Sequence, residues 1–423
     1  MRKIFFIAAM SLIFLPAISC DSPEAITEII PEDIPGVITD KNILEVGPGR
    51  QFDRLQSATL KAKPGNIILI REGIYGGGDV ISNLKGRDTA WITIRAATGE
   101  NVIFRGGSTA FQLSDPAYLI IEGLVFEQQT SNGVNIDDAG TFETPAHHIK
   151  IIDCEWRSMS ATGNNDELKM SGVDEFLVKN CHFSNSSEGG SLIDMVGCHK
   201  GVFEGNYFEN GGSNCIQAKG GTFDITIQRN RFVNGGERAI NIGGSTGLQF
   251  FRPLQTLYEA SDIKVWSNVF IGSTAPVAYV GAVNCEVVNN TFINPGTWAL
   301  RILQENNNPG ILTCGNNIFR NNLIVIPATG SPVINIGPNT NPGSFIFSNN
   351  LWYNSVKPFW SGPELPVSET GQILNADPQF LDVQYHLKSS SPAIGQGYPV
   401  QLPENDYFGK RFAANRVIGA IEY

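Results

Sequence analysis

Charged residues are scarce in this sequence, and bases are scarcer than acids. Only 17% of the 423 residues are charged, against roughly a quarter in an average globular protein. The 30 bases face 41 acids, which gives a formal net charge of −11. A general nucleic-acid binder is excluded, because phosphate binding needs a basic face. We therefore expect no nucleic-acid partner.

Long hydrophobic runs are missing after the N-terminus, although 42% of the residues are hydrophobic. This balance excludes a disordered chain, a coiled coil and a multi-span membrane protein. Glycine is abundant instead, with 45 residues, and asparagine recurs throughout. Such a composition favours many turns and short strands over helices.

Cysteine motifs for metal binding are also lacking, since no CxxC pair and no Cys/His spacing of a zinc site occurs. A chain of this size builds a core without the disulfides that a small secreted domain needs. We therefore expect the six cysteines after Cys20 to be small apolar core residues. These are Cys154, Cys181, Cys198, Cys215, Cys285 and Cys314.

The first 20 residues predict an export signal. Arg2 and Lys3 precede an apolar run over 4–18 that is too short to span a bilayer comfortably. The run ends in AISC, and a small residue directly before a cysteine resembles a bacterial lipobox. An ordinary secretory signal with an incidental cysteine is the alternative. We expect lipidation at Cys20, with the exported protein anchored at the bacterial outer membrane or cell surface without spanning it.

From residue 120 a short apolar/polar alternation recurs and closes on a large hydrophobe, at steps of 22 to 38 residues. The closing residues are Phe126, Trp156, Phe183, Phe208, Phe232, Phe270, Phe292, Ile324 and Trp352. Such a period with Gly/Asn turns is typical of a solenoid. The segments have neither a 3.6-residue period nor a leucine-rich-repeat pattern. We predict an all-β, single-stranded, right-handed parallel β-helix with about three short strands per coil.

An asparagine stands two residues before most of the later closing hydrophobes. Equivalent residues of stacked coils lie about 4.8 Å apart, so their amides can hydrogen-bond along the stack. We predict such a ladder, with ligand contact as the alternative. The residues are Asn206, Asn230, Asn268, Asn290, Asn322 and Asn350.

The predicted β-helix spans 41–375, after an acidic, proline-rich tether over 21–40. A short amphipathic helix around Leu55 is expected to cap the first coil, because an open sheet edge invites aggregation. The segment over 376–423 breaks the period and is predicted to close the other end. This tail resembles the C-terminal segment of many secreted bacterial β-helix proteins. We expect a monomer.

A second strand column precedes each closing hydrophobe by about ten residues. Alternate side chains of a strand face outward, and in this column one outward position carries Lys169, Asp194, Gln217, Asn241, Ala278 and Arg301. The other outward position has one charged residue, Lys219, and Arg238 stands at the edge of the next strand. We predict a polar stripe with chemical function. A solvated face with weak ion pairs is the alternative.

The longest step, 38 residues, predicts an insertion near 247–261. Insertions in solenoids form loops on one face, often the binding face. Phe250, Phe251 and Tyr258 are candidates for stacking on sugar rings, and Arg252 for binding a carboxylate or sulfate. A hydrophobic flap packed on the barrel is the alternative.

This predicted architecture resembles the pectate-lyase-like superfamily of polysaccharide lyases and related glycan enzymes, over residues 42–423. In its chondroitinase-B and alginate-lyase branch, a Lys-Ser follows a strand with two glutamates, and an Arg-His-Gly comes about one coil later. Lys219, in the run Ala-Lys-Gly, stands at the lysine position. The glutamate positions hold Gly212 and Asn214, and the Arg-His-Gly place is filled by Asn-Ile-Gly over 241–243. Lys219 alone carries over from this pattern.

The resemblance implies an exported enzyme that cleaves a uronic-acid-containing glycan by β-elimination. The proton at C5 becomes acidic when an arginine or a divalent cation neutralises the adjacent carboxylate. A lysine with a lowered pKa can then take that proton. The candidate catalytic residues are Lys219, Arg238, Lys169 and Asp194. The candidate substrate-binding residues are Asn241, Arg252, Phe251, Tyr258, Arg301 and Gln217.

Cofactor use stays open at this point. The resemblance implies Ca²⁺, but the sequence lacks the two glutamates of the branch. A loop over 137–148 mixes acids and histidines without the spacing of a metal site, so we predict no metal ligand.

Two other functions also stay open. A glycoside hydrolase needs two carboxylates, and Asp194 with Glu237 or Asp166 is a candidate pair. A non-catalytic glycan-binding or structural protein of the cell surface needs only the polar stripe and the aromatic residues. Acids outnumber bases between 160 and 310, which opposes broad attraction of a polyanion. Fold alone does not choose among these functions.

Overall fold

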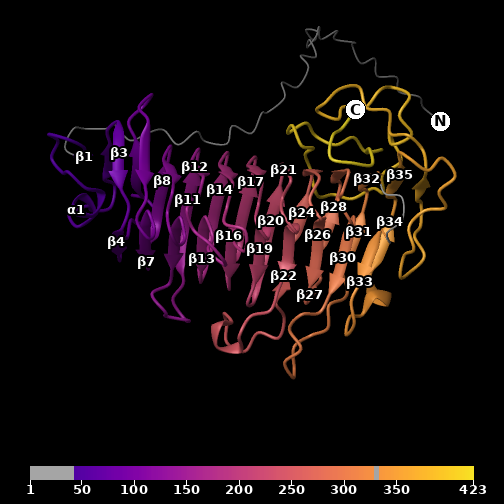
Figure 1. Cartoon of the computed structure of the whole chain (residues 1–423), viewed down its shortest axis with the longest axis horizontal. Helices are drawn as coiled ribbons and strands as arrows, with labels where there is room; N and C mark the ends of the chain where they lie inside the picture. Colours follow the sequence, from indigo (N-terminus) through magenta and orange to yellow (C-terminus); the bar gives the residue numbers. More distant parts are fainter. Residues whose placement is uncertain (1–41, 328–332) are drawn as a thin grey trace, which may run out of the picture. The chain divides into compact units, whose positions relative to one another are not determined.

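The structure is a computed structural model that describes residues 42–327 and 333–423. Within these residues the strands form three parallel sheets, named A, B and C below, in which successive coils stack (Figure 1). From β2 (Ile67–Ile70) to β35 (Leu351–Asn354) the chain passes in turn through A, B and C and then returns to A. The predicted right-handed parallel β-helix is confirmed. In the described part, no helix is both long and apolar enough to cross a membrane.

The strands are short, and each sheet takes one strand from nearly every coil. Sheet A contains β1 (Ile43–Val46), β2 (Ile67–Ile70), β5 (Ile92–Ala96), β8 (Ala117–Glu122), β11 (Ala146–Ile152), β14 (Val173–Lys179), β17 (His199–Glu204), β20 (Thr222–Gln228), β23 (Ala260–Ser261), β24 (Lys264–Trp266), β27 (Ala282–Val283), β28 (Glu286–Val288), β31 (Ile318–Arg320) and β34 (Ile346–Ser348). Sheet B contains β3 (Gly73–Gly76), β6 (Val102–Arg105), β9 (Val125–Glu127), β12 (Glu155–Arg157), β15 (His182–Ser184), β18 (Tyr207–Glu209), β21 (Arg231–Val233), β25 (Val269–Ile271), β29 (Thr291–Ile293), β32 (Leu323–Ile326), β35 (Leu351–Asn354) and β36 (Ile373–Leu374). Sheet C contains β4 (Asp79–Ser82), β7 (Phe111–Ser114), β10 (Val134–Asp137), β13 (Leu168–Ser171), β16 (Ser191–Val196), β19 (Asn214–Lys219), β22 (Arg238–Gly243), β26 (Ala275–Val280), β30 (Leu300–Leu303) and β33 (Ile334–Ile336).

The closing hydrophobes of the sequence repeat form one column of sheet B inside the solenoid. Each pairs in register with the next, from Phe126 to Trp352. The ring of Phe232 stacks on Phe208 at 4.8 Å and on Phe270 at 4.7 Å between centroids, which is the spacing of neighbouring strands. The six cysteines are buried and free, as expected. The repeat therefore builds the core.

The predicted asparagine ladder is present and buried. The Oδ1 atom of Asn290 accepts hydrogen bonds from the backbone N and the Nδ2 of Asn268, at 2.9 and 3.0 Å. The Nδ2 of Asn290 donates in turn to Val265 O and to Asn322 Oδ1. At the last rung Glu369 replaces the asparagine and accepts from the backbone N and Nδ2 of Asn350. The ladder thus satisfies buried backbone groups where the chain turns.

The first coil is capped as the sequence predicts. The helix α1 (Leu55–Thr59) buries Leu55 and Ala58 against the core. The predicted N-terminal signal, the predicted lipidation at Cys20 and the predicted tether over 21–40 lie outside the described residues.

The C-terminal segment differs from the prediction. The last coil is followed by Trp360, Leu365 and Val367, which pack against the end of the core. The segment over 376–423 lies along the outside of sheet B instead, where its apolar residues cover outward side chains of β25, β32 and β35 (Figure 1). The outward residues of these strands are apolar and need cover, which a segment across the end would not give.

The long sequence step between Phe232 and Phe270 is a loop over 244–259, between β22 and β23. It contains the short 3₁₀ helix η2 (Leu248–Phe250). We call it the insertion loop. It begins directly after sheet C, next to the polar stripe, so it is placed to wall one side of that surface.

Candidate active site

The outward positions of sheet C match the sequence alignment. Lys169 pairs in register with Asp194, Asp194 with Gln217, and Gln217 with Asn241. The column continues through Ala278 to Arg301. Strand alternation therefore predicts which side chains reach this face.

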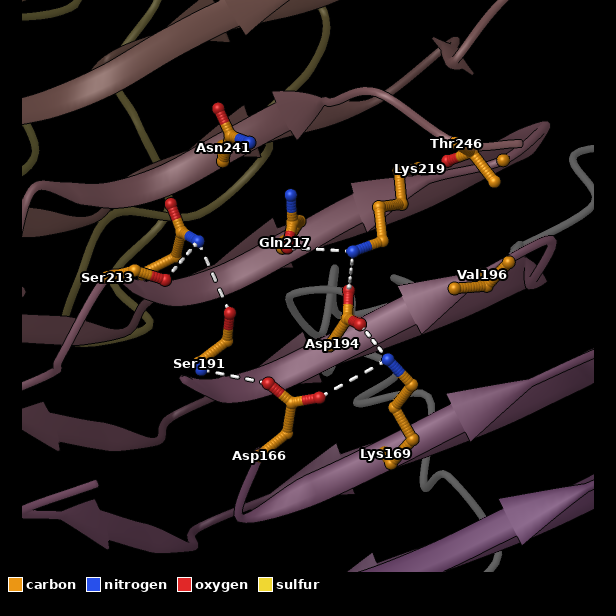
Figure 2. A network of polar contacts seen from close by, with 12 residues as sticks. Asp166, Lys169, Ser191, Asp194, Val196, Ser213, Gln217, Lys219, Asn241 and Thr246 are labelled. Atoms are coloured by element: carbon orange, nitrogen blue, oxygen red, sulfur yellow. Dashed lines mark hydrogen bonds and ion pairs between the residues drawn. The ribbon is translucent and has the colours of Figure 1, made fainter. Parts of the chain in front are cut away.

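Two lysines meet at one buried carboxylate. Lys169 on β13 and Lys219 on β19 reach Asp194 on the intervening β16 from opposite sides (Figure 2). The Lys219 Nζ lies 3.2 Å from Asp194 Oδ1 and donates to Gln217 Oε1 at 3.1 Å. The Lys169 Nζ pairs with Asp194 Oδ2 and, at 3.2 Å, with Asp166 Oδ2. Two ammonium groups and two carboxylates thus form a balanced network.

The carboxylates of this network lie beneath the lysines. The side chains of Asp194 and Asp166 are 1% and 2% exposed, against 16% for Lys219 and 22% for Lys169. Burial and the neighbouring Asp194 raise the pKa of Asp166, against the opposing effect of Lys169. Burial by itself would lower the pKa of Lys169, but the Asp194 and Asp166 carboxylates outweigh it and raise that pKa. Lys169 is therefore held as a cation.

The insertion loop folds back over the neighbouring coils. Arg252 lies against Gly197, and its guanidinium donates to both carboxylate oxygens of Asp138, at 2.5 and 2.7 Å. Its Cζ also lies 4.2 Å from the ring centroid of Phe142. Asp138 is buried and accepts from the backbone N of Gly140. The predicted anion-binding side chain is thus already occupied by a carboxylate of this chain.

A buried glutamate fixes the base of the insertion loop. The carboxylate of Glu259 accepts hydrogen bonds from Gly220 N, from Thr246 N and Oγ1, and from Asn306 Nδ2. A buried carboxylate that accepts several hydrogen bonds is well satisfied. Glu259 therefore ties both ends of the loop to the coil that carries Lys219.

The loop and the sheet enclose a pocket of about 460 Å³ above the network. Its floor comes from Lys169, Lys219 and Val196, and its wall from Phe250 and Arg252. The lining within the described residues holds three bases and no acid. Each of these bases also pairs with a carboxylate, Asp166, Asp194 or Asp138, but those acids are buried outside the lining, so the basic groups are what the pocket presents. The pocket is therefore suited to an anionic ligand.

The aromatic residues of the loop do not all serve as predicted. Phe251 is fully buried, so its ring packs inside the protein and is not available to a sugar. Phe250 beside it is 57% exposed and lines the pocket. Tyr258 is half-buried, and burial raises the pKa of its hydroxyl. Phe250 is thus the aromatic side chain of this loop that faces the pocket.

The remaining candidates form a second group farther along sheet C. Arg238 Nη1 donates to Asn241 Oδ1 at 3.0 Å, and its Nη2 pairs with Glu305 at 2.7 Å. Asn241 is buried and donates to Gly243 O. Arg301 lies two coils beyond Asn241 in the same column. The structure therefore separates Arg238 from the pocket in which Lys219 lies.

Asp194 with Asp166, one of the two carboxylate pairs predicted for hydrolysis, is poorly placed for that reaction. Asp166 and Asp194 share the ammonium of Lys169 and have almost no exposed surface. Glycoside hydrolysis needs two carboxyl groups that flank the scissile bond. A pair buried under a shared lysine does not offer that arrangement.

The residues at the glutamate positions of the resembled branch do not fit a calcium ion. Gly212 has no side chain, and Asn214 is buried with its amide donating to the hydroxyls of Ser191 and Ser213. In the described residues, no group of three or more His, Cys, Asp or Glu stands together as a metal site. Calcium prefers six or more oxygen ligands, so we derive no step through it.

Three site residues are not located by the strand pattern, although Asp166 is a candidate for the hydrolase pair from the sequence. Asp166 stands in the turn before β13, and Asp138 and Glu259 stand in loops. Each becomes important through a contact with a residue from another coil or loop, Lys169, Arg252 and Gly220 respectively. The alternation of side chains along a strand does not extend to turns and loops, so it does not identify these three residues.

Comparisons with known proteins agree with this architecture. A family model described as chondroitinase B matches residues 50–202, a range that includes Lys169 and Asp194 and ends before Lys219. The solved structure of pectate lyase Pel9A is 13% identical, with 87% of this chain and 90% of that chain covered and a TM-score of 0.55. The structure of XylC with xylose is 10% identical, with 90% and 98% covered and a TM-score of 0.56.

A rhamnogalacturonan lyase structure is 13% identical, with 77% of this chain and 90% of that chain covered and a TM-score of 0.51. A comparison with curated protein sequences finds no match. Identities this low speak for the fold alone. The chain therefore has the pectate-lyase-like, right-handed parallel β-helix fold of the polysaccharide lyases.

Proposed function

We propose that this protein binds an acidic polysaccharide along sheet C and cleaves it by β-elimination at a uronic acid. The observation that carries the proposal is the pocket lined by Lys169, Lys219 and Arg252 with no acid in its described lining. The chain as a whole carries a net charge of −11, so a locally basic pocket is a specific feature rather than a consequence of composition. We also propose export and lipid anchoring through Cys20, from the N-terminal sequence alone.

The two lysines suit different tasks in this reaction. Lys169 contacts two carboxylates and stays cationic, so its ammonium, which lines the pocket, is suited to pairing with the uronate carboxylate. That pairing makes the C5 proton more acidic. Lys219 contacts one carboxylate and a neutral amide, so it is the lysine better suited to act as the base. Phe250 offers an apolar ring face for the sugar.

The proposed step needs no oxidant, reductant or second substrate. The Nζ of a neutral Lys219 takes the proton from C5, and the electrons of the C5–H bond form a double bond between C4 and C5. The bond between C4 and the glycosidic oxygen breaks, and the leaving oxygen takes a proton from solvent. The products are one new reducing end and one unsaturated uronate.

Ultraviolet absorbance of the unsaturated uronate tests this proposal on a panel of uronate polysaccharides. General-base catalysis contributes about 10²- to 10⁴-fold, so Lys219→Ala is expected to lower the rate at least about 100-fold. Lys264→Ala is the matched control, since Lys264 also pairs with an aspartate but lies on sheet A.

Each outcome decides between the open functions. Full activity of Lys219→Ala would remove Lys219 as the base. Absence of any unsaturated product from the wild type, with new reducing ends, would favour hydrolysis. Absence of both would favour a binding or structural role.

A further inference from the structure

A second group of bases lies on sheet C, away from the Lys169–Lys219 pocket. Arg301 on β30 occupies the same outward column as Gln217 on β19, three strands farther along. Neighbouring strands lie about 4.8 Å apart, so the two positions are separated by about 14 Å along the stack. This distance exceeds one sugar unit and lies along the direction in which the polar stripe runs.

Arg301 has no carboxylate partner among the described residues. Its Nε donates to Asn335 Oδ1 at 3.0 Å, and its Cζ lies 4.5 Å from the ring centroid of Trp298. Burial and the nearby Arg238 guanidinium lower the pKa of Arg301, against opposing effects of Glu305 and Glu237. The tryptophan and the asparagine fix the plane of the guanidinium, and its remaining N–H groups are left for a ligand.

Arg238 supplies the second guanidinium. It donates to Asn241 and pairs with Glu305, while its Nε is buried without a hydrogen-bond partner in the described structure. Glu305 and Glu237 are both exposed. An ion pair to an exposed carboxylate contributes little, so an incoming carboxylate or sulfate can replace Glu305 at low cost. Arg238 thus reaches the column position of Asn241, two strands from Arg301, and two guanidinium groups on one sheet face with one displaceable acid can bind an anion.

We propose that Arg238 and Arg301 form a second anion-binding subsite on sheet C, which takes an acidic group of the same polysaccharide several sugar units from the Lys219 pocket. This subsite rests on the proposed function for the identity of the polymer. It reassigns Arg238 from the candidate catalytic residues to substrate binding. It also requires a polymer that carries acidic groups on more than one unit.

Calorimetric titration of the full chain as the Lys219→Ala variant tests the subsite without cleavage. The probes are dimers and hexamers of galacturonate, mannuronate and chondroitin. Arg301→Gln is expected to weaken hexamer binding about tenfold, since a charge-assisted hydrogen bond is lost, and to leave dimer binding within about twofold. Glu305→Gln is expected to tighten hexamer binding, because it removes the competing carboxylate. Arg95→Gln on sheet A is the matched control, expected to change neither.

Equal affinities of Arg301→Gln and Arg95→Gln for the hexamers would overturn the subsite, and so would an equal loss for dimers and hexamers. Weaker rather than tighter binding by Glu305→Gln would also overturn it. If hexamer binding depends on Arg301 as expected but the wild type does not cleave the polymer, the subsite stands and the lyase proposal falls. If the wild type cleaves the polymer but hexamer binding does not depend on Arg301, the lyase proposal stands and the subsite falls. If no acidic oligosaccharide binds, both fall.

Discussion

The two site lysines differ in the number of carboxylates that they contact. Lys169 pairs with Asp166 and Asp194, whereas Lys219 pairs with Asp194 alone. Strand alternation predicts from the sequence that Lys169, Asp194 and Lys219 point outward. It does not predict Asp166, because a residue in a turn has no fixed side. The residue types were therefore predictable, and the separate roles of the lysines were not.

Glu167 follows Asp166 in the chain, but its side chain is buried in the core and does not join this network. Its side chain is completely buried, and no base pairs with it in the described residues. Burial raises the pKa of Glu167 well above its ordinary value, and neither of its carboxyl oxygens has a hydrogen-bond partner in the described structure. The folded protein therefore holds Glu167 as a neutral acid at pH values where the unfolded chain ionises it.

Glu167→Gln is expected to gain stability relative to the wild type as pH rises. Above about pH 4.3 the unfolded glutamate loses its proton while the buried one keeps it, so the wild type loses up to about 1.4 kcal/mol per pH unit. The glutamine does not titrate. Melting temperatures measured across acidic and neutral pH check this, with Glu72→Gln, an exposed glutamate, as the control. Parallel curves for wild type and Glu167→Gln would contradict the account.

The asparagine ladder is repeated from coil to coil, whereas the insertion loop occurs once. The ladder follows from a repeated position, so a single sequence is enough to predict it. The insertion loop is located by the step between Phe232 and Phe270, but its course depends on Arg252 meeting Asp138, which lies 114 residues away in the chain. A contact that is made once leaves no period in the sequence. This is why Arg252 was expected to bind the ligand directly.

The ladder is expected to be a major source of stability. Asn290→Ala leaves the backbone N of Asn268 and the carbonyl of Val265 without their side-chain partner. A buried polar group left unpaired costs about 1–3 kcal/mol, so a loss of at least about 2 kcal/mol is expected in denaturant unfolding. Asn101→Ala, at an exposed asparagine outside the ladder, is the control and is expected to change stability little. Equal losses of stability in the two variants would show that a ladder asparagine contributes no more than an exposed one.

At the scale of the whole molecule, the distribution of charge matters more than its sum. The excess of acids between 160 and 310 argues from the sequence against a polyanion ligand. In the structure several of these acids are buried or paired, as Asp166, Asp194 and Glu259 are. Bases remain at the surface of the pocket. Composition predicts the net charge but not which charges face a ligand.

The position of the long C-terminal segment is likewise not predictable from the sequence. Its break in period marks 376–423 as distinct from the coils, and no strand of the three sheets lies in this segment. Its position along sheet B depends on outward apolar residues such as Leu323 and Leu351. These look like core residues in the sequence, because both faces of their strands are covered.

The most direct test of the central claim is the mass of the products formed in ¹⁸O-labelled water. The polymer is digested by the wild type, with Lys219→Ala in parallel. β-Elimination adds no water across the broken bond, so the account predicts unsaturated products that lack ¹⁸O and are each lighter than the saturated oligomer by one water. The Lys219→Ala digest should contain almost none. Saturated products with ¹⁸O at the new reducing end would show hydrolysis and contradict the account.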